Sequence, residues 1–372
     1  MQKRVIVSVI NDLVTDQRVN KVCQTLTSIS CDVLLVGRKM RNSPKLDDRD
    51  YAMHRMKLMF DNGPLFYAEF NIRLFILLLF RKADLFISND LDTLLPNHIV
   101  SKIKRIPLVY DSHEYFTEVP ELVNRKRTQA IWKFIERKLF SLQTDIITVN
   151  DSIADLFEKD YGTRPHIVRN IPRKRQSVKK LSREELSLPV DTNILILQGS
   201  GINMHRGSEE LVEAMQYVKN AVLLIIGGGD VIDELKKMSK TFKLDKKIIF
   251  LPRMPYQQLM QYTAVADIGL TLDKSTNLNY KFSLPNKLFD YIQAGIPVLS
   301  SSLPEIEKII TKYNVGDFIF NHDPKSIADK INEMLSNKTQ MEKWKKNCNF
   351  AASELTWENE EKVLIDIYSK YV

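Results

Sequence analysis

The residues with the most suggestive spacing lie between Ser283 and Asp290, in the run Ser-Leu-Pro-Asn-Lys-Leu-Phe-Asp. Pro285 is typical of the first turn of a helix and Gly295 of the residue that ends one, so a helix is predicted here. Lys287 then stands in the first turn, where the helix dipole disfavours a cation unless an anion neutralises it. Asp290 lies on the same face. This spacing fits a phosphate held by Lys287 and the free amides, with ribose hydroxyls donating to Asp290. It also fits a plain surface pair of Lys287 and Asp290.

Two glycine clusters precede helical segments in the same half of the chain. Residues 199–201 read Gly-Ser-Gly and run on to Arg206, and residues 227–229 are three glycines. Glycine lets the backbone turn tightly, and an arginine beside a helix N-terminus makes an anion site. The spacing matches neither the dinucleotide-binding GxGxxG nor a Walker motif, so it does not support a dehydrogenase or a kinase. Tight turns without a ligand explain both clusters equally well.

Polar residues also follow two predicted strands in the first half of the chain. Asp90 and Asp92 come after the strand at 85–88, and His113 and Glu114 come after the strand at 108–111. Ligands of open parallel sheets bind beyond the carboxyl ends of the strands, so these side chains are expected to face a cleft. An imidazole with a pKa near ~6.5 suits contact with a sugar hydroxyl or a general-base role. A histidine satisfied by loop backbone and solvated loop carboxylates are the alternatives.

The elements that position these residues alternate in two series. Short runs rich in valine and isoleucine are each followed by a turn and by helical periodicity, which predicts βαβ units around parallel sheets. Residues 171–192 separate the series and have the composition of a linker, and residues 357–372 are predicted to form a closing helix. The predicted strands are 5–10, 32–36, 85–88, 108–111, 146–149 and 166–169, then 194–197, 222–226, 248–251, 268–272, 297–300 and 317–320.

The composition is that of a globular protein: 372 residues, of which 44% are hydrophobic and 27% are charged, suggest two domains. The apolar run Leu74–Phe80 is too short to cross a bilayer and is interpreted as a buried helix segment. The segment Val5–Ile10 is interpreted as a strand rather than a signal peptide, so a cytoplasmic location is expected. Cys23, Cys31 and Cys348 have no metal-site spacing, so free thiols and no bound metal are expected.

A formal charge of +8 favours anionic ligands or anionic membrane surfaces. The basic clusters 125–127 and 173–175 lack the interleaved aromatic residues of single-strand binders, and no finger or helix-turn-helix pattern is present, so nucleic acid is not predicted as a partner. Arg73 and Arg81 flank the apolar run, which fits peripheral attachment to the inner membrane and equally fits a buried helix with solvated ends.

The segments from Arg206 through 227–229 and 285–298 to Gly316 together resemble the donor domain of GT-B glycosyltransferases, specifically the retaining, family 4-like group. The similarity covers essentially the whole chain. In that family an acidic residue on the helix binds the ribose, and Asp290 stands there in place of the usual glutamate. In the same family a lysine and an arginine usually bind the diphosphate.

Arg206 matches the lysine of that pair, whereas Ser200 stands where its arginine is expected. Phe282 occupies the position of the first acidic residue of the family, and Lys287 is the candidate to supply the missing positive charge. The loop at 251–256 resembles the loop that meets the nucleobase. The loop at 11–18 takes the place of a glycine-rich loop beside the diphosphate. The resemblance and the spacing together give as catalytic candidates His113, Arg206 and Lys287; as donor-binding residues Gly199, Ser200, Gly201, Arg206, Gly228, Arg253, Met254, Ser283, Leu284, Pro285, Asn286, Lys287 and Asp290; and as acceptor-side residues Asp16, Arg18, Asp90, Asp92 and Glu114.

The implied fold is α/β of the GT-B type, with two Rossmann-like domains whose parallel sheets face an interdomain cleft. Residues 1–175 form the acceptor domain, 176–355 the nucleotide-sugar domain, and 356–372 a helix that crosses back to the first. The implied activity is transfer of a hexose from a UDP- or GDP-linked sugar to a sugar or lipid-linked acceptor, in polysaccharide or glycoconjugate synthesis, without cofactor or metal. The alternatives are a nucleotide-sugar epimerase on this scaffold and a noncatalytic sugar-binding homologue.

Overall fold

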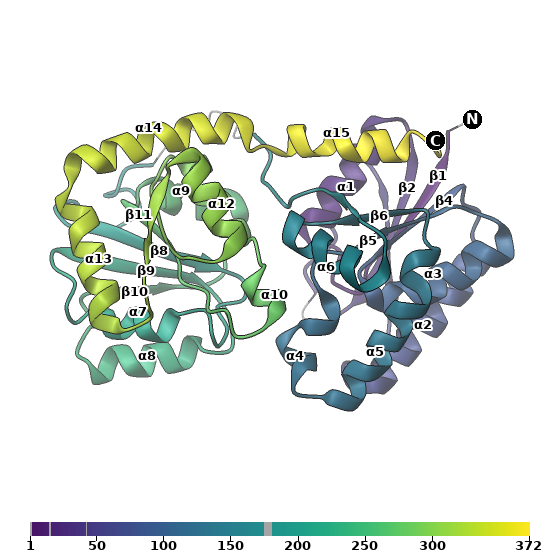
Figure 1. The fold of residues 1–372 in the computed structure, drawn as a ribbon, viewed down its shortest axis with the longest axis horizontal. Helices are drawn as coiled ribbons and strands as arrows, with labels where there is room; N and C mark the ends of the chain where they lie inside the picture. The colour runs from purple at the N-terminus through teal and green to yellow at the C-terminus, as the bar shows by residue number, and fades with distance from the viewer. Residues whose placement is uncertain (1, 15, 42, 175–180) are drawn as a thin grey trace. The chain divides into compact units, whose positions relative to one another are not determined.

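The computed structural model describes residues 2–14, 16–41, 43–174 and 181–372. The chain divides into two compact units, one of Met1–Asn170 with Glu360–Val372 and the other of Ile171–Asn359. Each unit is built on one parallel sheet flanked by helices (Figure 1), which confirms the α/β class and the two Rossmann-like domains. The predicted linker begins where the second unit begins, and its residues 175–180 lie outside the described residues.

The first unit holds a seven-stranded sheet in the order β3-β2-β1-β4-β5-β6-β7, with its neighbouring strands parallel. The chain moves outward from β1 to β3 and then returns to β4 on the other side of β1, which makes the β1/β4 boundary the point where ligands bind such sheets. The strands are β1 (Arg4–Ser8), β2 (Asp32–Lys39), β3 (Ala52–Lys57), β4 (Leu85–Asn89), β5 (Leu108–Asp111), β6 (Asp145–Thr148) and β7 (His166–Ile167). The helices are α1 (Gln17–Ser28), α2 (Gly63–Phe80), α3 (Leu91–Lys104), α4 (Pro120–Val123), α5 (Lys126–Leu139), α6 (Asp151–Tyr161) and α15 (Trp357–Tyr368).

Most predicted strands of this unit are confirmed, but β3 was missed. Its sequence, Ala-Met-His-Arg-Met-Lys, has no run of valine or isoleucine, because β3 lies at the sheet edge and is only partly buried. Arg55 of β3 instead forms an ion pair of 2.7 Å with the buried Asp12. An edge strand held partly by charge carries no apolar signature in the sequence.

The apolar run at 74–80 was interpreted as a buried helix segment, and this interpretation is wrong, because helix α2 is buried along one stripe only. The helix is 18 residues long, and by length and composition it could cross a membrane, but only 22% of it is buried within its unit. Phe66, Phe70, Leu74 and Leu78 form the buried stripe. The opposite face is apolar too and is exposed.

The second unit has a six-stranded sheet in the order β10-β9-β8-β11-β12-β13, and its described pairs are parallel. All six strands were predicted. The strands are β8 (Asn193–Gly199), β9 (Ala221–Gly227), β10 (Ile248–Leu251), β11 (Ile268–Thr271), β12 (Val298–Ser301) and β13 (Gly316–Ile319). The helices are α7 (Ser208–Ala214), α8 (Ile232–Thr241), α9 (Tyr256–Ala264), α10 (Leu278–Lys281), α11 (Asn286–Ala294), α12 (Pro304–Tyr313), α13 (Pro324–Ser336) and α14 (Lys338–Glu354).

The core of this unit lies on both faces of the sheet. Along β8, Ile194 and Ile196 belong to one apolar cluster, and Leu195 and Leu197 belong to the other. Alternate side chains of a strand point to opposite faces, so a strand covered by helices on both sides must be apolar throughout. This is why the uninterrupted aliphatic runs predicted the strands of this sheet so well.

The last helix is anchored in the first unit by its acidic residues and by the chain end that follows it. Glu360 accepts hydrogen bonds from the Arg169 backbone N–H at 2.8 Å and from its Nε at 3.0 Å. Thr25 donates to Glu361 at 2.8 Å, and Lys370 donates to Asp145 at 2.8 Å. These contacts fasten residues from 360 onward to the first unit.

Candidate functional site

In the second unit, Arg206 and Lys287 converge on the carboxylate of Asp273, which is fully buried just after β11. Oδ1 of Asp273 lies 3.1 Å from Nη1 of Arg206, and Oδ2 lies 3.7 Å from Nζ of Lys287. Thr271 donates a hydrogen bond of 3.1 Å to Oδ2. Two residues predicted separately, 81 positions apart in the sequence (287 − 206 = 81), therefore share one counterion.

Two close backbone approaches produce this convergence. Gly207 has φ of +70°, and a Cβ there would lie 2.2 Å from the carbonyl oxygen of Leu272, so the turn at Arg206 sits directly against the residue before Asp273. A Cβ at Gly269 of β11 would lie 2.2 Å from the ring of Tyr291, which holds α11 close to β11. Lys287, about one turn earlier on α11, thereby reaches Asp273.

The electrostatics of this cluster favour an anionic ligand. Burial opposes the charge of Asp273, but Lys287 and Arg206 outweigh burial, and the pKa of Asp273 is lowered. Burial lowers the pKa of Lys287 and Asp273 offsets only part of this effect. One carboxylate serves two cations, so one positive charge of the cluster is left for a ligand to neutralise.

The start of α11 presents backbone donors beside Lys287. The helix begins at Asn286, one residue later than the sequence suggested, and Pro285 is its extended N-cap residue without a side-chain hydrogen bond to the first turn. Gly295 ends the helix with φ of +77°, as expected. Amides of a first turn that lacks a side-chain cap are natural partners for an anion.

The two glycine clusters meet each other. A Cβ at Gly227 would lie 1.8 Å from the carbonyl oxygen of Gly199, and one at Gly229 would lie 2.0 Å from that of Ile202. These contacts favour the tight-turn interpretation for both glycines. Gly228 differs, because a Cβ there would lie 2.6 Å from Nε of Arg253, whose guanidinium also donates to the carbonyl oxygen of Ser200. Ser200, Gly228 and Arg253 therefore lie together.

Asp290 is buried in a polar network that the sequence did not reveal. Its Oδ2 accepts a hydrogen bond of 3.0 Å from Gln198, and its Oδ1 accepts one of 2.8 Å from the hydroxyl of Tyr256. Thr263 donates to the other end of the Gln198 amide at 2.7 Å, which fixes the orientation of that amide. Gln198 and Tyr256 thereby hold the carboxylate of Asp290 in one orientation.

The remaining donor-side candidates lie around these groups. Met254 and Leu284 are partly buried against the apolar core, whereas Asn286 is exposed. Ser283 donates a hydrogen bond of 2.9 Å to the carbonyl oxygen of Tyr280, and the ring of Tyr280 lies 4.2 Å from the guanidinium of Arg206. The candidates follow β8, β9, β10 and β11 or lie at the start of α11, at the carboxyl edge of the sheet.

In the first unit, His113 lies between two carboxylates and an amide. Its Nδ1 is 3.3 Å from Oδ2 of Asp90, and its Nε2 is 3.5 Å from Oδ2 of Asp111 and 3.1 Å from Oδ1 of Asn89. The backbone N–H of His113 also donates to Asp90 at 2.8 Å. The backbone of Asp90 has φ of +60°, which is uncommon for a residue other than glycine. Its side chain contacts the loop of His113.

These charges decide the protonation state of His113. Burial lowers its pKa, but Asp90 and Asp111 outweigh burial and raise the pKa to about 9. Burial likewise opposes ionisation of Asp111, yet Arg18 and His113 lower its pKa. At neutral pH the ring is therefore a cation that donates hydrogen bonds. Of the two roles suggested by the sequence, the geometry favours the hydrogen-bond donor over the general base.

The other acceptor-side candidates have identifiable roles in the fold. Asp16 caps α1 by accepting from the Val19 N–H at 3.0 Å. Arg18 is buried and pairs with Asp111 at 2.7 Å. Asp92 is buried in the first turn of α3, and burial together with the charges of Asp90 and Glu114 raises its pKa well above the usual range. Glu114 follows His113 in the same loop and is partly exposed.

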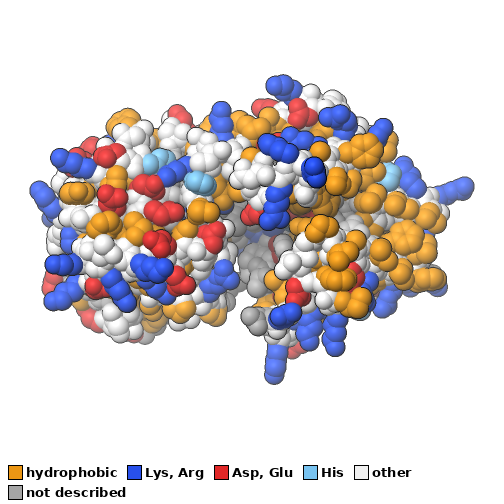
Figure 2. Space-filling model, turned by 90° about the horizontal axis from the view of Figure 1, so that it is seen from below, with side chains coloured by type: hydrophobic (Ala, Val, Ile, Leu, Met, Phe, Trp, Pro, Cys, Tyr) orange, Lys and Arg blue, Asp and Glu red, His pale blue; other side chains and the backbone are white. Residues whose placement is uncertain are grey.

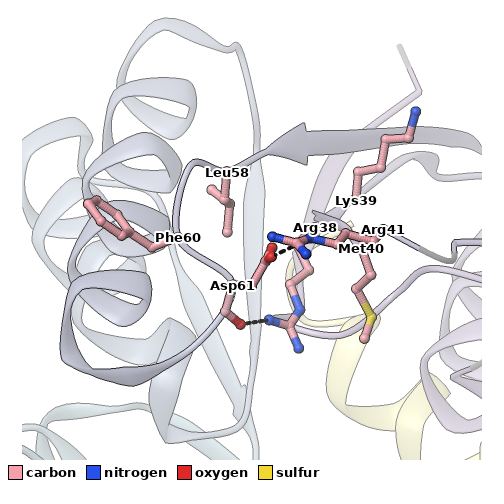
Figure 3. Close-up of a pocket in the computed structure, with 7 residues that line it drawn as sticks. All are labelled: Arg38, Lys39, Met40, Arg41, Leu58, Phe60 and Asp61. Atoms are coloured by element: carbon pink, nitrogen blue, oxygen red, sulfur yellow. Dashed lines mark hydrogen bonds and ion pairs between the residues drawn. The ribbon is translucent and has the colours of Figure 1, made fainter.

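A basic pocket of about 250 Å³ at the carboxyl ends of β2 and β3 was not anticipated (Figure 3). Arg38, Lys39 and Arg41 line it, together with Leu58, Phe60 and other residues of the loop before α2. Asp61 holds two of these cations: its carboxylate is 2.8 Å from Nε of Arg41, and its carbonyl oxygen accepts from Arg38 at 3.4 Å.

Several residues of both clusters were missed, although one rule could have found most of them. Asp273 comes two residues after the end of β11, and Asn89 and Asp111 end β4 and β5, so all three occupy the carboxyl-end positions where polar residues of parallel sheets collect. Gln198 and Tyr256 gave no comparable signal. Among the described residues, no group of three or more histidine, cysteine, aspartate or glutamate side chains is arranged to hold a metal ion. The three cysteines are buried free thiols, as expected.

Comparison with known proteins matches both halves of the chain to glycosyltransferase families. The family Glycosyltransferase Family 4 matches residues 17–173, and the family Glycosyl transferases group 1 matches residues 178–349. D-inositol 3-phosphate glycosyltransferase of Xylanimonas cellulosilytica is 20% identical over 193 residues, which are 50% of this chain and 45% of that protein. The chain spans about half the length of the curated relatives that it matches.

Solved structures share the fold over nearly the whole chain. Sucrose-phosphate synthase from Thermosynechococcus elongatus superposes with a TM-score of 0.82 at 15% identity, covering 99% of each chain. Anabaena HepE in complex with UDP and glucose has a TM-score of 0.75 at 14% identity, covering 99% of this chain and 100% of that one. At such identities the likeness shows the fold alone. With both halves matched, the chain belongs to the GT-B fold glycosyltransferases of the family 4-like group.

Proposed function

We infer that this protein transfers a hexose from a nucleoside diphosphate sugar to a hydroxyl of a sugar or lipid-linked acceptor, with retention of anomeric configuration. The observation that carries this proposal is the cluster in which Arg206 and Lys287 share the buried carboxylate of Asp273 beside the uncapped start of α11. Two cations and free amides suit the diphosphate of such a donor.

The cluster would act on the leaving group. Cleavage of the bond between sugar and phosphate leaves negative charge on the departing diphosphate, and cations held in place before the reaction stabilise that charge without reorganising. Asp273 holds both cations in place, and the positive charge that it leaves uncompensated is the part available to the transition state. These two residues would do the work that a metal ion does in other designs.

Asp290 would receive the ribose hydroxyls. Gln198 and Tyr256 fix its carboxylate, and a carboxylate is an acceptor for hydroxyl groups. Arg253 and Met254, in the loop after β10, would lie beside the base. A UDP-linked donor is the first candidate, because HepE, whose fold this chain shares, binds UDP and glucose.

His113 in the first unit would hold sugar hydroxyls. As an imidazolium between Asp90 and Asp111, it donates hydrogen bonds, and its charge is suited to oxygen atoms that gain negative charge during transfer. We place the protein in the cytoplasm, at the membrane surface, in the synthesis of a polysaccharide or glycoconjugate.

Nucleotide binding is the first test. Calorimetric titration with UDP, GDP and their glucose conjugates should show one nucleoside diphosphate binding with a stoichiometry of one. Each nucleotide sugar is then incubated with and without sugar acceptors, and the products are separated. Transfer to an acceptor supports the proposal.

Two other outcomes would assign a different function to the protein. An isomerised donor formed without any acceptor would identify a nucleotide-sugar epimerase on the same scaffold. Donor binding with neither hydrolysis, isomerisation nor transfer across the acceptor panel would identify a noncatalytic sugar-binding homologue, a role consistent with Phe282 at the position of a family acid. Failure to bind any nucleoside diphosphate would refute the donor site itself.

A further inference from the structure

The outer face of α2 is an unusual surface for a folded unit. Leu65, Ile72, Ile76 and Phe80 are exposed by 60%, 61%, 49% and 82% of their areas. Their spacing of seven, four and four residues places them along one stripe of the helix, away from the buried stripe that packs on the unit. A helix that is apolar all round is normally covered on both sides, and α2 is covered on one.

Two neighbouring helices extend the stripe into a patch. Helix α3 packs beside α2 and exposes Leu95, Ile99 and Ile103, which repeat every four residues. Helix α5 packs beside α3 and exposes Ile131 and Phe134. Seen from below, Figure 2 shows hydrophobic side chains gathered on this unit. Apolar patches that join several elements mark interaction sites on protein surfaces.

The exposed charged residues of the same helices are almost all basic. Exposed lysines and arginines occur at 73, 81–82, 102, 105, 125–127 and 137–138, next to or within α2, α3 and α5. In residues 63–82, 91–105 and 120–139, Glu121 is the exposed acid. Figure 2 shows lysine and arginine side chains along the border of the hydrophobic area. The patch is therefore apolar in its centre and positive at its border.

Both ends of α2 also adjoin cationic pockets. The pocket of Figure 3 carries Arg38, Lys39 and Arg41 and is formed by the loop that leads into the helix. A second pocket, of about 390 Å³, lies at the helix end, where three cations, Arg4, Arg81 and Lys82, line it together with one acid, Asp32, and apolar residues that include Phe80. Nε of Arg38 is buried with no hydrogen-bond partner among the described residues. The apolar stripe thus runs between two groups of cations.

The combination of an apolar centre with a positive border shows which kind of partner fits this surface. A second copy of the chain would bring the same positive border against itself, and like charges facing each other oppose association. An anionic bilayer supplies both complements, since its acyl boundary accepts aliphatic and aromatic side chains and its headgroups attract lysine and arginine.

We propose that the face of α2, α3 and α5 is a membrane-docking surface for anionic lipid. Helix α2 lies parallel to the bilayer with Ile72, Ile76 and Phe80 in the acyl boundary, and the surrounding cations contact the headgroups. The buried stripe stays packed on its own unit, so docking requires no unfolding of the helix. The proposal concerns attachment and holds whether or not the donor site is active.

The test is co-sedimentation of the full chain with vesicles of phosphatidylcholine, alone or mixed with phosphatidylglycerol. The wild type should bind the anionic vesicles, and high salt should weaken binding. The variant Ile72→Gln, Ile76→Gln, Phe80→Gln keeps good helix formers on an exposed face and should raise the apparent Kd by at least about 10-fold. Its near-wild-type melting temperature would show that it is folded.

The control variant is Phe320→Gln, Phe350→Gln, which removes side chains exposed by 92% and 61% in the second unit and should leave vesicle binding unchanged. Equal binding by the wild type and the α2 variant would overturn the proposal, as would the absence of wild-type binding. A wild-type dimer in analytical ultracentrifugation that the α2 variant converts to a monomer, without vesicle binding, would assign the face to a second copy instead.

Discussion

Replacing Asp273 by asparagine tests the idea that one buried carboxylate keeps two cations ready for a diphosphate. Asparagine has nearly the same shape, and a carbonyl oxygen in the place of Oδ1 still accepts the hydrogen bond of Arg206. An NH2 group then replaces Oδ2, to which Thr271 donates, so the hydroxyl of Thr271 has to become the acceptor. The negative charge is lost. Arg206 and Lys287, of which the side chains are exposed by only 24% and 12%, then lose their shared counterion.

The cost follows from the two distances. At 3.1 Å and 3.7 Å, with an effective dielectric constant of about 20, each cation interacts with the carboxylate by on the order of 5 kcal/mol, much of it offset by desolvation. Removing one member of a buried pair typically costs about 3–5 kcal/mol. We take the lower end, about 3 kcal/mol, because the hydrogen bond from Arg206 remains. For a unit of this size, the melting temperature falls by about 6–12 °C.

The ligand should reverse the loss. UDP supplies the negative charge that Asp273 no longer provides, so the rise in melting temperature caused by saturating UDP should be larger in Asp273→Asn than in the wild type. The assay is differential scanning calorimetry with and without UDP at constant ionic strength. The matched control is Asp233→Asn on α8, where the side chain is 92% exposed and its pair with Lys236 is weak.

A melting temperature for Asp273→Asn within the error of the wild type would refute the buried counterion. A smaller UDP-induced rise than in the wild type would refute the idea that the carboxylate and the diphosphate occupy the same electrostatic role. Either result would remove the main support for the donor site.

Lys287→Ala should weaken UDP binding by about 1.5–3 kcal/mol in calorimetry, because a charge-assisted contact is lost; Lys237→Ala on α8, whose side chain is 76% exposed, should leave it unchanged, and equal affinities would take Lys287 out of the site. His113→Ala should cut turnover in a product assay with little effect on UDP affinity, and a fully active variant would contradict its role. The folded pKa of His113 is raised to about 9, so its stabilising contribution, on the order of 3 kcal/mol, is complete below about 6.5 and is lost as pH rises through about 9. The difference in unfolding free energy between the wild type and His113→Gln should therefore shrink over that window, and a constant difference would count against the charged ring. Burial raises the pKa of Glu136 to about 7, so its ionisation destabilises the fold as pH rises above about 4.5. Glu136→Gln should accordingly raise the melting temperature at pH ~8 more than at pH ~5, and the same shift at both values would disprove the buried acid.

Local sequence signals predicted the strands well, for a reason seen in β8. A strand covered on both faces must be apolar at every position, and such runs are visible without knowledge of the partners. The edge strand β3 has no such requirement and was missed. Helix α2 shows the opposite error, because an apolar run does not say whether both faces are covered.

The candidate sites were predicted only in part. The rule that polar residues collect at carboxyl ends of strands located His113, Asp90 and the turn at Arg206. It did not show that Asp290 is bound by Gln198 and Tyr256, residues 92 and 34 positions away. Nor did it predict the charge of His113, which depends on the distances to two carboxylates.

The sequence by itself determined the two βαβ series, the glycine turns and the helix that starts beside Lys287, because each depends on residues close together in the chain. Tertiary structure alone decided which carboxylate neutralises Arg206 and Lys287, and which face of α2 remains uncovered. Electrostatic interactions depend on separation in space and on burial, and both are set by packing between elements distant in sequence.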